Sequence, residues 1–291
     1  MGQGPIFSIL LPTHNRPETL ALAIRSVLAQ TVADWELLVV GDGCTDQTAD
    51  VVAGFADPRI RWFDLPKAPG FGYVNRNIGL REARGELIAF LGHDNLFLPD
   101  HLERTGMVFS RPVVQFAYVR PLYIRDDGVV APFFVNLAVP RERTEFMTQR
   151  NTLPATCVVH RRSAFDKVGM WPEEMERGGD WDLWKRILQE FGPGAARLVR
   201  SATNLHFRAN WRPEVGWGPA PLSYLFALHD AGRFWPKQLD LILEQADGLP
   251  QAQVWAMMAR DPSAFATRLR NGCDVLQDML SWNASMDPAF R

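Results

Sequence analysis

Short apolar runs alternate with segments of helical periodicity over residues 6–109. Ile6–Leu11 and Trp35–Val40 are apolar except for Ser8 and Glu36, as expected for strands buried on both faces. Further strands are predicted at Arg59–Asp64 and Glu86–Leu91. Helices are predicted between and after these strands: one carrying Leu20, Ile24, Val27 and Leu28, then Thr45–Phe55, Gly72–Arg84 and Pro99–Phe109. This alternation predicts an α/β fold with a mainly parallel sheet flanked by helices.

The start of the first helix carries a capping signal. Asn15 lies three residues before Glu18, in the spacing of a capping box, and we expect it to cap this helix. Thr45 or Asp46 is the predicted cap of the second helix.

The pattern changes after residue 110. Val113–Arg125 is predicted to form antiparallel strand structure that turns at Asp126-Asp127-Gly128, whereas residues 130–160 are expected to be irregular. Helices are predicted at Ser163–Val168 and Asp180–Glu190, with a short strand at Ala196–Arg200. From about Pro219 onward only helical periodicity remains. The sequence therefore predicts an α/β domain at residues 1–215 and a helical extension at 216–291.

Composition narrows the class of protein. Of the 291 residues 47% are hydrophobic and 22% charged, as in globular proteins, and the net charge of −2 favours no nucleic-acid partner. The three cysteines are isolated, which argues against a disulfide framework or a structural zinc site and fits a reducing compartment. No apolar run is long enough for a membrane span, and the N-terminus lacks the features of a signal peptide. We expect a cytoplasmic protein, with attachment to the inner face of the membrane left open.

Three polar segments directly follow apolar strands. They are Thr13-His14-Asn15, Gly41-Asp42-Gly43 and Gly92-His93-Asp94-Asn95. Ligands of open parallel sheets bind beyond the carboxyl ends of the strands, so these segments are expected to meet at one rim. The chain has neither a G-x-G-x-x-G segment after its first strand nor a G-x-x-x-x-G-K-[ST] loop, which disfavours the dinucleotide-binding and P-loop folds.

Several of these segments, in this order and spacing, resemble family 2 glycosyltransferases, which are inverting enzymes with the A-type glycosyltransferase (GT-A) fold. The resemblance extends from about residue 6 to residue 208. It rests on Ser8–Pro17, Ser26–Thr31, Trp35–Val40 with Asp42–Asp46, Arg76–Gly79, Gly85–Leu91 with Asp94, and Gly169–Pro172 followed by Gly178–Arg186.

The resemblance implies a nucleotide-sugar site at the rim. Asp42 matches the family acid that accepts a hydrogen bond from the N–H of uracil, and His14 is expected to stack on or flank the base. Pro12 and Thr13 are expected to shape this pocket, and Arg76 matches an arginine that reaches the diphosphate. The alternatives are structural: a helix cap for Asp42, a turn residue for His14 and a solvated side chain for Arg76.

The resemblance also implies a divalent metal, Mn or Mg. Asp94 matches the final acid of the family's D-x-D sequence, which binds the metal that bridges the two phosphates, although Gly92 replaces the first acid. His93 is expected to contact the ribose or phosphate, and His206 to lie near the metal or diphosphate. A helix or turn cap is the alternative for Asp94, and an ordinary structural histidine for His206. Arg208 is a weaker candidate for the diphosphate.

Asp180 matches the family's catalytic base. Displacement at the anomeric carbon requires a carboxylate within hydrogen-bond reach of the acceptor hydroxyl, and Gly178-Gly179 permits close approach of the backbone. Asp182 is the competitor, but two residues along a helix it points elsewhere. Trp181 and Trp184 are expected in the core or in the acceptor wall. Trp211 and Trp217 either stack on sugars or are buried.

The predicted reaction moves one sugar from a nucleoside diphosphate, UDP being favoured, to a hydroxyl with inversion. The resemblance alone suggests the acceptor, a glycan or lipid-linked saccharide in surface polysaccharide assembly. A nucleotidyltransferase, a non-catalytic nucleotide-sugar-binding protein and a hydrolase using Asp180 remain the alternatives. The extension at 216–291 is open to four roles: packing on the front domain, a lid, a homo-oligomer contact or a membrane-surface helix around Arg233, Phe234, Trp235 and Lys237.

Overall fold

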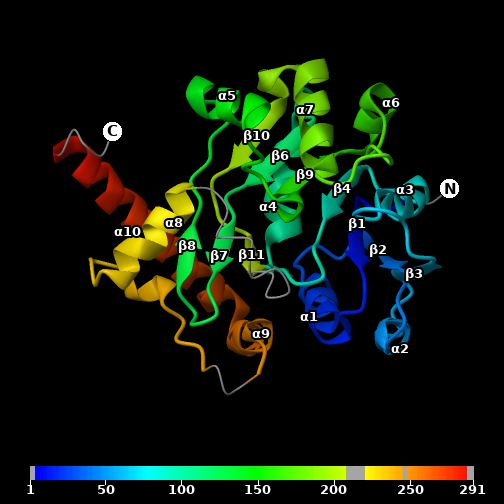
Figure 1. Ribbon diagram of the computed structural model, residues 1–291, viewed down its shortest axis with the longest axis horizontal. Coiled ribbons are helices and arrows are strands. Elements are labelled where there is room, and N and C mark those ends of the chain that lie inside the picture. The colour runs from blue at the N-terminus through cyan, green and yellow to red at the C-terminus, as the bar shows by residue number, and fades with distance from the viewer. Residues whose placement is uncertain (1–3, 208–219, 245–247, 287–291) are drawn as a thin grey trace. The chain divides into compact units, whose positions relative to one another are not determined.

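A computed structural model describes residues 4–207, 220–244 and 248–286 (Figure 1). Its strands are β1 (Phe7–Thr13), β2 (Trp35–Asp42), β3 (Ile60–Leu65), β4 (Leu87–Phe90), β5 (Leu96–Phe97), β6 (Phe116–Val119), β7 (Leu122–Ile124), β8 (Val130–Pro132), β9 (Val158–Arg161), β10 (Ala196–Val199) and β11 (Asn204–Phe207). Its α-helices are α1 (Pro17–Leu28), α2 (Thr48–Ala53), α3 (Tyr73–Arg81), α4 (His101–Gly106), α5 (Pro140–Thr148), α6 (Phe165–Val168), α7 (Gly179–Phe191), α8 (Ala220–Asp230), α9 (Pro250–Arg260) and α10 (Pro262–Met286).

The main sheet has seven strands in the order β10-β6-β9-β4-β1-β2-β3. Strands β4, β1, β2 and β3 run parallel, β6 is parallel to β10, and β9 is antiparallel to both β4 and β6. Every residue of β2 and β4 is buried, as the continuous apolar runs predicted. The predicted α/β class with a mainly parallel, helix-flanked sheet is therefore confirmed.

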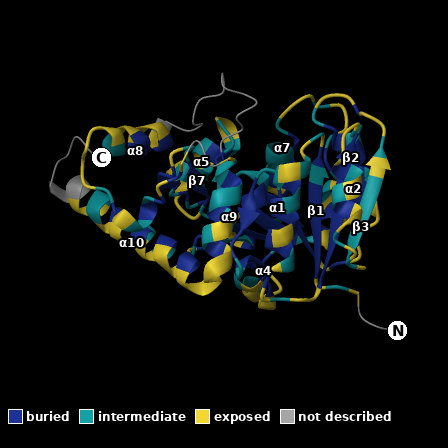
Figure 2. Ribbon diagram, turned by 90° about the horizontal axis from the view of Figure 1, so that it is seen from below, coloured by how far each residue is buried: buried dark blue, intermediate teal, exposed yellow. Residues whose placement is uncertain are grey.

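Helices cover both faces of this sheet. On one face Ile9 and Leu37 belong to a core that includes Leu20 and Ile24 of α1. On the other face α3 lies so close to β2 that a Cβ on Gly79 would be 2.6 Å from the Val40 side chain. In Figure 2 the inner strands are buried, whereas β3 at the edge of the sheet is only half-buried.

The chain divides into two compact units, residues 1–121 with 134–204, and residues 122–133 with 205–291. In the second unit β7 pairs parallel with β11 and antiparallel with β8, and the β7–β8 connection turns through Gly128 as predicted. The remaining elements include α8, α9 and α10, so the C-terminal region is helical, as expected. Within the described ranges, none of the helices has the length and apolarity needed to cross a bilayer. The predicted domain boundary at 215/216 and the candidates Arg208, Trp211 and Trp217 lie outside the described residues.

The prediction that residues 130–160 are irregular was wrong. This segment contains β8, α5 and most of β9, and β9 lies inside the main sheet between β6 and β4. The periodic signal was weak because α5 buries only Phe146 and β9 has only four residues. Strands β6 and β7, both within the predicted Val113–Arg125 segment, join different sheets.

The capping prediction for Asn15 was also wrong. Asn15 has a φ of 48°, and its carboxamide accepts a hydrogen bond from the Thr45 N–H (2.8 Å) instead of an α1 amide. Helix α1 begins with Pro17 at its first position, where a missing N–H costs nothing, and has no side-chain cap. At the second helix, the Asp46 carboxylate does accept the N–H of Thr48 (3.1 Å), although Gln47 occupies the cap position.

Candidate active site

The ends of three adjacent parallel strands form the rim that the sequence predicted. In the register of the sheet Thr13 of β1 pairs with Gly41 of β2, and Leu10 pairs with Phe90 near the end of β4. The residues that follow these strands therefore emerge at one edge. This edge brings together the segments that contain His14, Asp42 and Asp94.

Asp42 is the most heavily bonded side chain of the rim. Its Oδ1 accepts hydrogen bonds from the Ala68 N–H (2.8 Å) and the Asn75 amide (2.7 Å), and its Oδ2 accepts one from Lys67. The residue is 8% exposed. The carboxylate thus fixes the loop between β3 and α3 to the end of β2.

His14 lies beside Asp42 and is exposed. Its Nδ1 is 2.8 Å from the carbonyl oxygen of Asp42, so Nδ1 carries the proton and Nε2 is left as an acceptor. Thr13 is buried, and its hydroxyl has no hydrogen-bond partner among the described residues. Pro12 is half-buried within β1. These residues form a partly polar surface at the end of β1.

Arg76 connects the rim to the start of α7. Its guanidinium lies over the rings of Trp171 (4.7 Å) and Tyr73 (5.2 Å) and interacts electrostatically with the carboxylates of Asp180 and Asp42. Burial lowers the pKa of this guanidinium, but arginine remains charged at neutral pH. Its Nε has no hydrogen-bond partner within the described ranges. Arg76 therefore supplies a desolvated positive charge with donor capacity to spare.

A close backbone contact positions the start of α7. Gly178 adopts a left-handed φ of 75°, and the N–H of Gly179 donates to the Tyr73 hydroxyl (2.9 Å). A Cβ on Gly179 would lie 2.7 Å from the Tyr73 ring, so the predicted close approach is present. The first helical turn then carries Asp180.

Asp180 is half-buried and has few hydrogen-bond donors. Its Oδ1 accepts the N–H of Trp181 (2.8 Å), and its Oδ2 accepts the amide of Asn151 (3.2 Å). Burial raises the pKa of Asp180 above its ordinary value, while the Trp181 N–H, the charge of Arg76 and the Asn151 amide oppose this rise. Asp182 instead forms an ion pair with Arg186 one turn along the helix (2.7 Å). Asp180 is therefore the carboxylate of α7 that is suited to accept a proton.

The loop after β4 contains His93 and Asp94, both half-buried. Burial lowers the pKa of His93, which keeps it neutral, and the charges of Asp94, Arg16 and Arg76 also act on it. His93 Nδ1 has no partner among the described residues. Because Arg76 interacts with both His93 and Asp180, one electrostatic cluster includes the β4 loop and the start of α7.

Residues 151–156 contact Asp180 at one end and the loop after β4 at the other. At one end Asn151 donates to Asp180, and at the other the Thr156 hydroxyl accepts the Gly92 N–H (3.3 Å) and the Asn95 amide (3.1 Å). A Cβ on Gly92 would lie 2.6 Å from the Asn95 amide nitrogen. The Asn95 and Asp94 side chains thus occupy the space that a side chain at position 92 would need, and Thr156 holds the Asn95 amide there.

Comparison with known proteins agrees with this geometry. Residues 8–169, more than half of the chain, match the family described as Glycosyl transferase family 2. The chain belongs to this family.

Family 2 relatives include the Escherichia coli protein WfgD, named a UDP-Glc:alpha-D-GlcNAc-diphosphoundecaprenol beta-1,3-glucosyltransferase. It is 34% identical over 128 residues, which cover 44% of this chain and 50% of WfgD. The chain thus spans about half the length of this relative.

Solved structures share the fold. TarS of S. aureus in complex with UDP-GlcNAc superposes with a TM-score of 0.58 at 17% identity, covering 90% of this chain and 72% of TarS. The mannosyltransferase PcManGT of Pyrobaculum calidifontis, in complex with GDP-Man and Mn²⁺, has a TM-score of 0.50 at 14% identity, covering 98% and 76%. The chain therefore has the GT-A fold of the family.

The residues of this family 2 protein fit a cation that is coordinated partly by the protein and partly by the phosphates of a bound ligand. Within the described ranges, no three His, Cys, Asp or Glu side chains form a self-sufficient metal site. Mg and related hard cations are often held by one or two carboxylates, with phosphates and waters completing the shell. Asp94 is the carboxylate that the sequence suggested for this role, and the role stays a prediction. His206 lies on β11 of the second unit, where its ring packs edge-on against Tyr123, and its role as a ligand stays a prediction.

Sequence reasoning missed several residues that build this site. Asn77 exchanges hydrogen bonds with the backbone of Trp171 (2.8 and 3.2 Å), so α3 is bonded to the Gly169–Pro172 segment. Asn151 and Thr156 lie in the segment expected to be irregular, where no local pattern identified them. Trp184 is fully buried, whereas the Trp181 indole donates to the Phe146 carbonyl on α5 (2.7 Å).

Proposed function

We propose that this protein transfers a sugar with inversion from a nucleoside diphosphate sugar, UDP-linked, to a hydroxyl of a glycan or lipid-linked saccharide. The observation that carries the proposal is the environment of the Asp180 carboxylate. This carboxylate is half-buried, has a raised pKa and lies beside the Arg76 cation. The activity for which WfgD is named and the UDP-GlcNAc complex of TarS support the donor and acceptor classes.

In this reaction Asp180 is the general base. Its carboxylate accepts the proton of the acceptor hydroxyl while the hydroxyl oxygen bonds to the anomeric carbon. The bond from that carbon to the diphosphate breaks on the opposite face, which inverts the configuration. A pKa above the ordinary aspartate value makes the ionised carboxylate a stronger base.

The leaving diphosphate is assigned to the positive side of the rim. Arg76 has unused donor capacity, and His93 has an unpartnered ring nitrogen among the described residues. Asp94 would hold a divalent metal, Mn or Mg, whereas the role that the sequence suggested for His206 stays a prediction. When bound, this cation would neutralise the negative charge that develops on the diphosphate. The Mn²⁺ complex of PcManGT supports such an ion.

The nucleoside is assigned to Asp42 and His14, beside Pro12 and Thr13. A carboxylate has about four lone-pair sites, and the three donors on Asp42 leave room for a base N–H. His14 is exposed next to it and offers a ring face and Nε2. We assign these steps to residues 1–215 and leave residues 216–291 for contacts with the acceptor, the membrane surface or a second copy.

A donor panel tests this function. UDP, GDP and dTDP sugars, each with and without Mn²⁺, are added to the purified protein, and the melting temperature is measured. We expect UDP sugars with Mn²⁺ to raise it most, because ligands stabilise the state they bind. Products are then analysed by NMR, and the anomeric coupling is expected to show inversion. Retention, or the absence of stabilisation by every donor, would contradict the proposal.

The same assays separate the alternatives. Release of pyrophosphate would indicate a nucleotidyltransferase. Saturable UDP-sugar binding without turnover across donors and acceptors would indicate a binding protein, the alternative that Gly92 suggested.

A further inference from the structure

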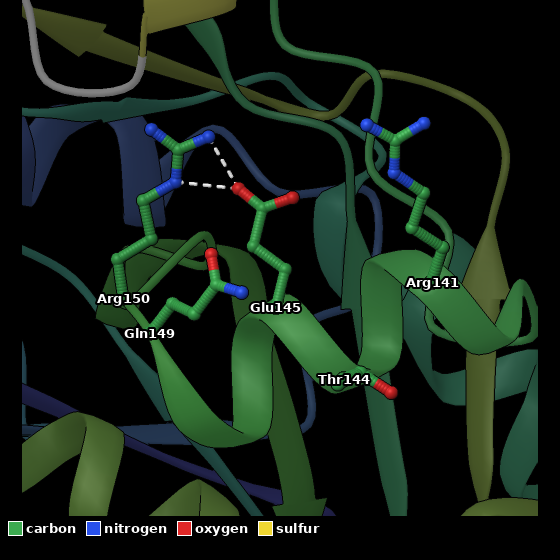
Figure 3. A pocket seen from close by; sticks show the side chains of 5 residues that line it. All are labelled: Arg141, Thr144, Glu145, Gln149 and Arg150. Carbon is green, nitrogen blue, oxygen red and sulfur yellow. Dashed lines mark hydrogen bonds and ion pairs between the residues drawn. The ribbon is translucent and has the colours of Figure 1, made fainter.

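A pocket of about 460 Å³ lies along α5, and none of its lining residues belongs to the candidate active site. Figure 3 shows its lining side chains, which come from α5 and the two residues after it: Arg141, Thr144, Glu145, Gln149 and Arg150. Arg141, Glu145 and Arg150 project from the same side of the helix. The pocket therefore presents two guanidinium groups and one carboxylate.

The charges of this pocket favour an anion. Arg150 is ion-paired with Glu145, which holds its guanidinium in place. Arg141 is exposed, and in the described part of the chain it has no hydrogen-bond or ion-pair partner. Thr144 and Gln149 add neutral donors. Since Glu145 offsets only one of the two guanidinium charges, the pocket keeps a net positive charge, which suits a phosphate or diphosphate.

The position of the pocket relates it to the proposed base. Arg150 is followed by Asn151, whose amide donates to Asp180 (3.2 Å). The next residue of α7, Trp181, donates its indole N–H to the carbonyl of Phe146 on α5 (2.7 Å). Two hydrogen bonds therefore connect the pocket-bearing segment to the first turn of α7.

The contacts of this segment follow one another along the chain. From the pocket the chain passes Asp180 at Asn151 and reaches the loop of Gly92 and Asp94 at Thr156. In the sequence, the pocket residues precede Asn151, whereas the contact with that loop follows it at Thr156. Because the donor diphosphate is assigned to that loop, we assign the acceptor to the pocket.

We propose that the α5 pocket binds a phosphate or diphosphate group carried by the acceptor, with Arg141 and Arg150 as its ligands. The acceptor hydroxyl would then be held at Asp180 while its anionic group lies on α5. The identification of the ligand's carrier as the acceptor rests on the proposed function. The anion site itself is tested separately.

Binding is measured first, without turnover. Inorganic pyrophosphate is titrated into the full chain, and the arginine Nε–H resonances are followed by NMR, with Arg141→Gln and Arg150→Gln used for assignment. We expect saturable shifts of the Arg141 and Arg150 resonances, and none for Arg25, an exposed arginine of α1. Glucuronate, which carries one negative charge, is expected to shift them at least tenfold more weakly. Unchanged Arg141 and Arg150 resonances at saturating pyrophosphate would overturn the anion site.

Kinetics then assign the site to the acceptor. Two synthetic acceptors are compared, a GlcNAc-diphosphoryl alkyl ester and the neutral alkyl GlcNAc glycoside. We expect Arg141→Gln to raise KM for the diphosphate acceptor about tenfold, the size of one lost charge-assisted hydrogen bond. KM for the neutral acceptor, KM for the donor and kcat should stay within twofold, and Arg25→Gln should change none of them.

The outcomes separate the two proposals. An equal rise of KM for both acceptors, or no rise for either, would overturn the acceptor pocket while leaving glycosyl transfer intact. If the wild-type protein transfers sugar to neither acceptor from any donor, the proposed function fails instead. The pyrophosphate titration then still decides whether α5 binds phosphate.

Discussion

Two carboxylates of the rim differ in how the fold holds them. Asp42, at the end of β2, accepts hydrogen bonds from a backbone N–H, a buried amide and a lysine. Asp180, at the start of α7, accepts one side-chain amide and the N–H of the next residue. Arg76 interacts with both. One acid is bonded into a loop, and the other is left with a raised pKa.

This difference separates a structural contribution from a chemical one. An acid whose oxygens are occupied by fixed donors stabilises the fold. A desolvated acid with few donors destabilises the fold slightly and gains basicity, which is a common property of catalytic groups. The comparison predicts opposite effects on activity and stability when each acid is neutralised.

The largest effect is expected on transfer. Asp180→Asn should lower kcat by about 10²–10⁴, the usual contribution of a general base, and leave UDP-sugar binding unchanged. Asp182→Asn, on the same helix turn but paired with Arg186, is the matched control and should keep kcat within a few-fold. Steady-state kinetics and donor titrations measure both. Near-normal transfer by Asp180→Asn would remove it as the base.

Stability should respond in the opposite order. Asp42→Ala leaves the Ala68 N–H and the buried Asn75 amide without their acceptor, so the free energy of unfolding should fall by about 2–4 kcal/mol. Asp180→Asn should leave it unchanged or raise it, because burial disfavours the charged carboxylate. Urea unfolding at neutral pH measures both variants. Lys67→Met, which removes a half-exposed partner of Asp42, should cost no more than about 1 kcal/mol. Equal losses of unfolding free energy for Asp42→Ala and Asp180→Asn would contradict the distinction between a structural and a chemical acid.

The pH dependence of transfer sharpens the comparison. Since the base must be ionised, kcat/KM should fall as the pH drops through the pKa of Asp180. Burial raises that pKa, so the acidic limb should lie above the ordinary value of 3.8. The measurement is a pH profile of kcat/KM, with donor binding followed in parallel. A limb that follows donor binding instead would point to the nucleotide side of the rim.

Much of this architecture could be predicted from local patterns. The run of β2 before Gly41 is apolar except for Glu36, so both its buried state and the polar rim that follows it were foreseeable. Asp180 was identified because Gly169–Pro172 followed by Gly178–Arg186 resembles the family's acceptor-side motif, which is a local signal. These features depend on residues that are neighbours in the chain.

The remainder depends on contacts between distant residues. Asn15 has a capping-box spacing but bonds to Thr45, because its positive φ turns it away from α1. The Asn151–Asp180 bond joins residues 29 positions apart and belongs to a segment without periodicity. Likewise nothing in the sequence indicated that Asn95, held by a hydrogen bond to Thr156, occupies the space next to Gly92.

The smallest effect tests the bond between Asn151 and Asp180. The Asn151 amide lowers the pKa of Asp180, so Asn151→Ala should move the acidic limb of kcat/KM to higher pH and change the alkaline plateau only a few-fold. Asn151→Asp should move the limb further in the same direction, because a second carboxylate disfavours ionisation of the first. Thr148→Ala, an exposed change at the end of α5, should leave the profile in place. If Asn151→Ala lowers the plateau without moving the limb, Asn151 contacts the acceptor or supports the loop, and the ionisation of Asp180 does not depend on it.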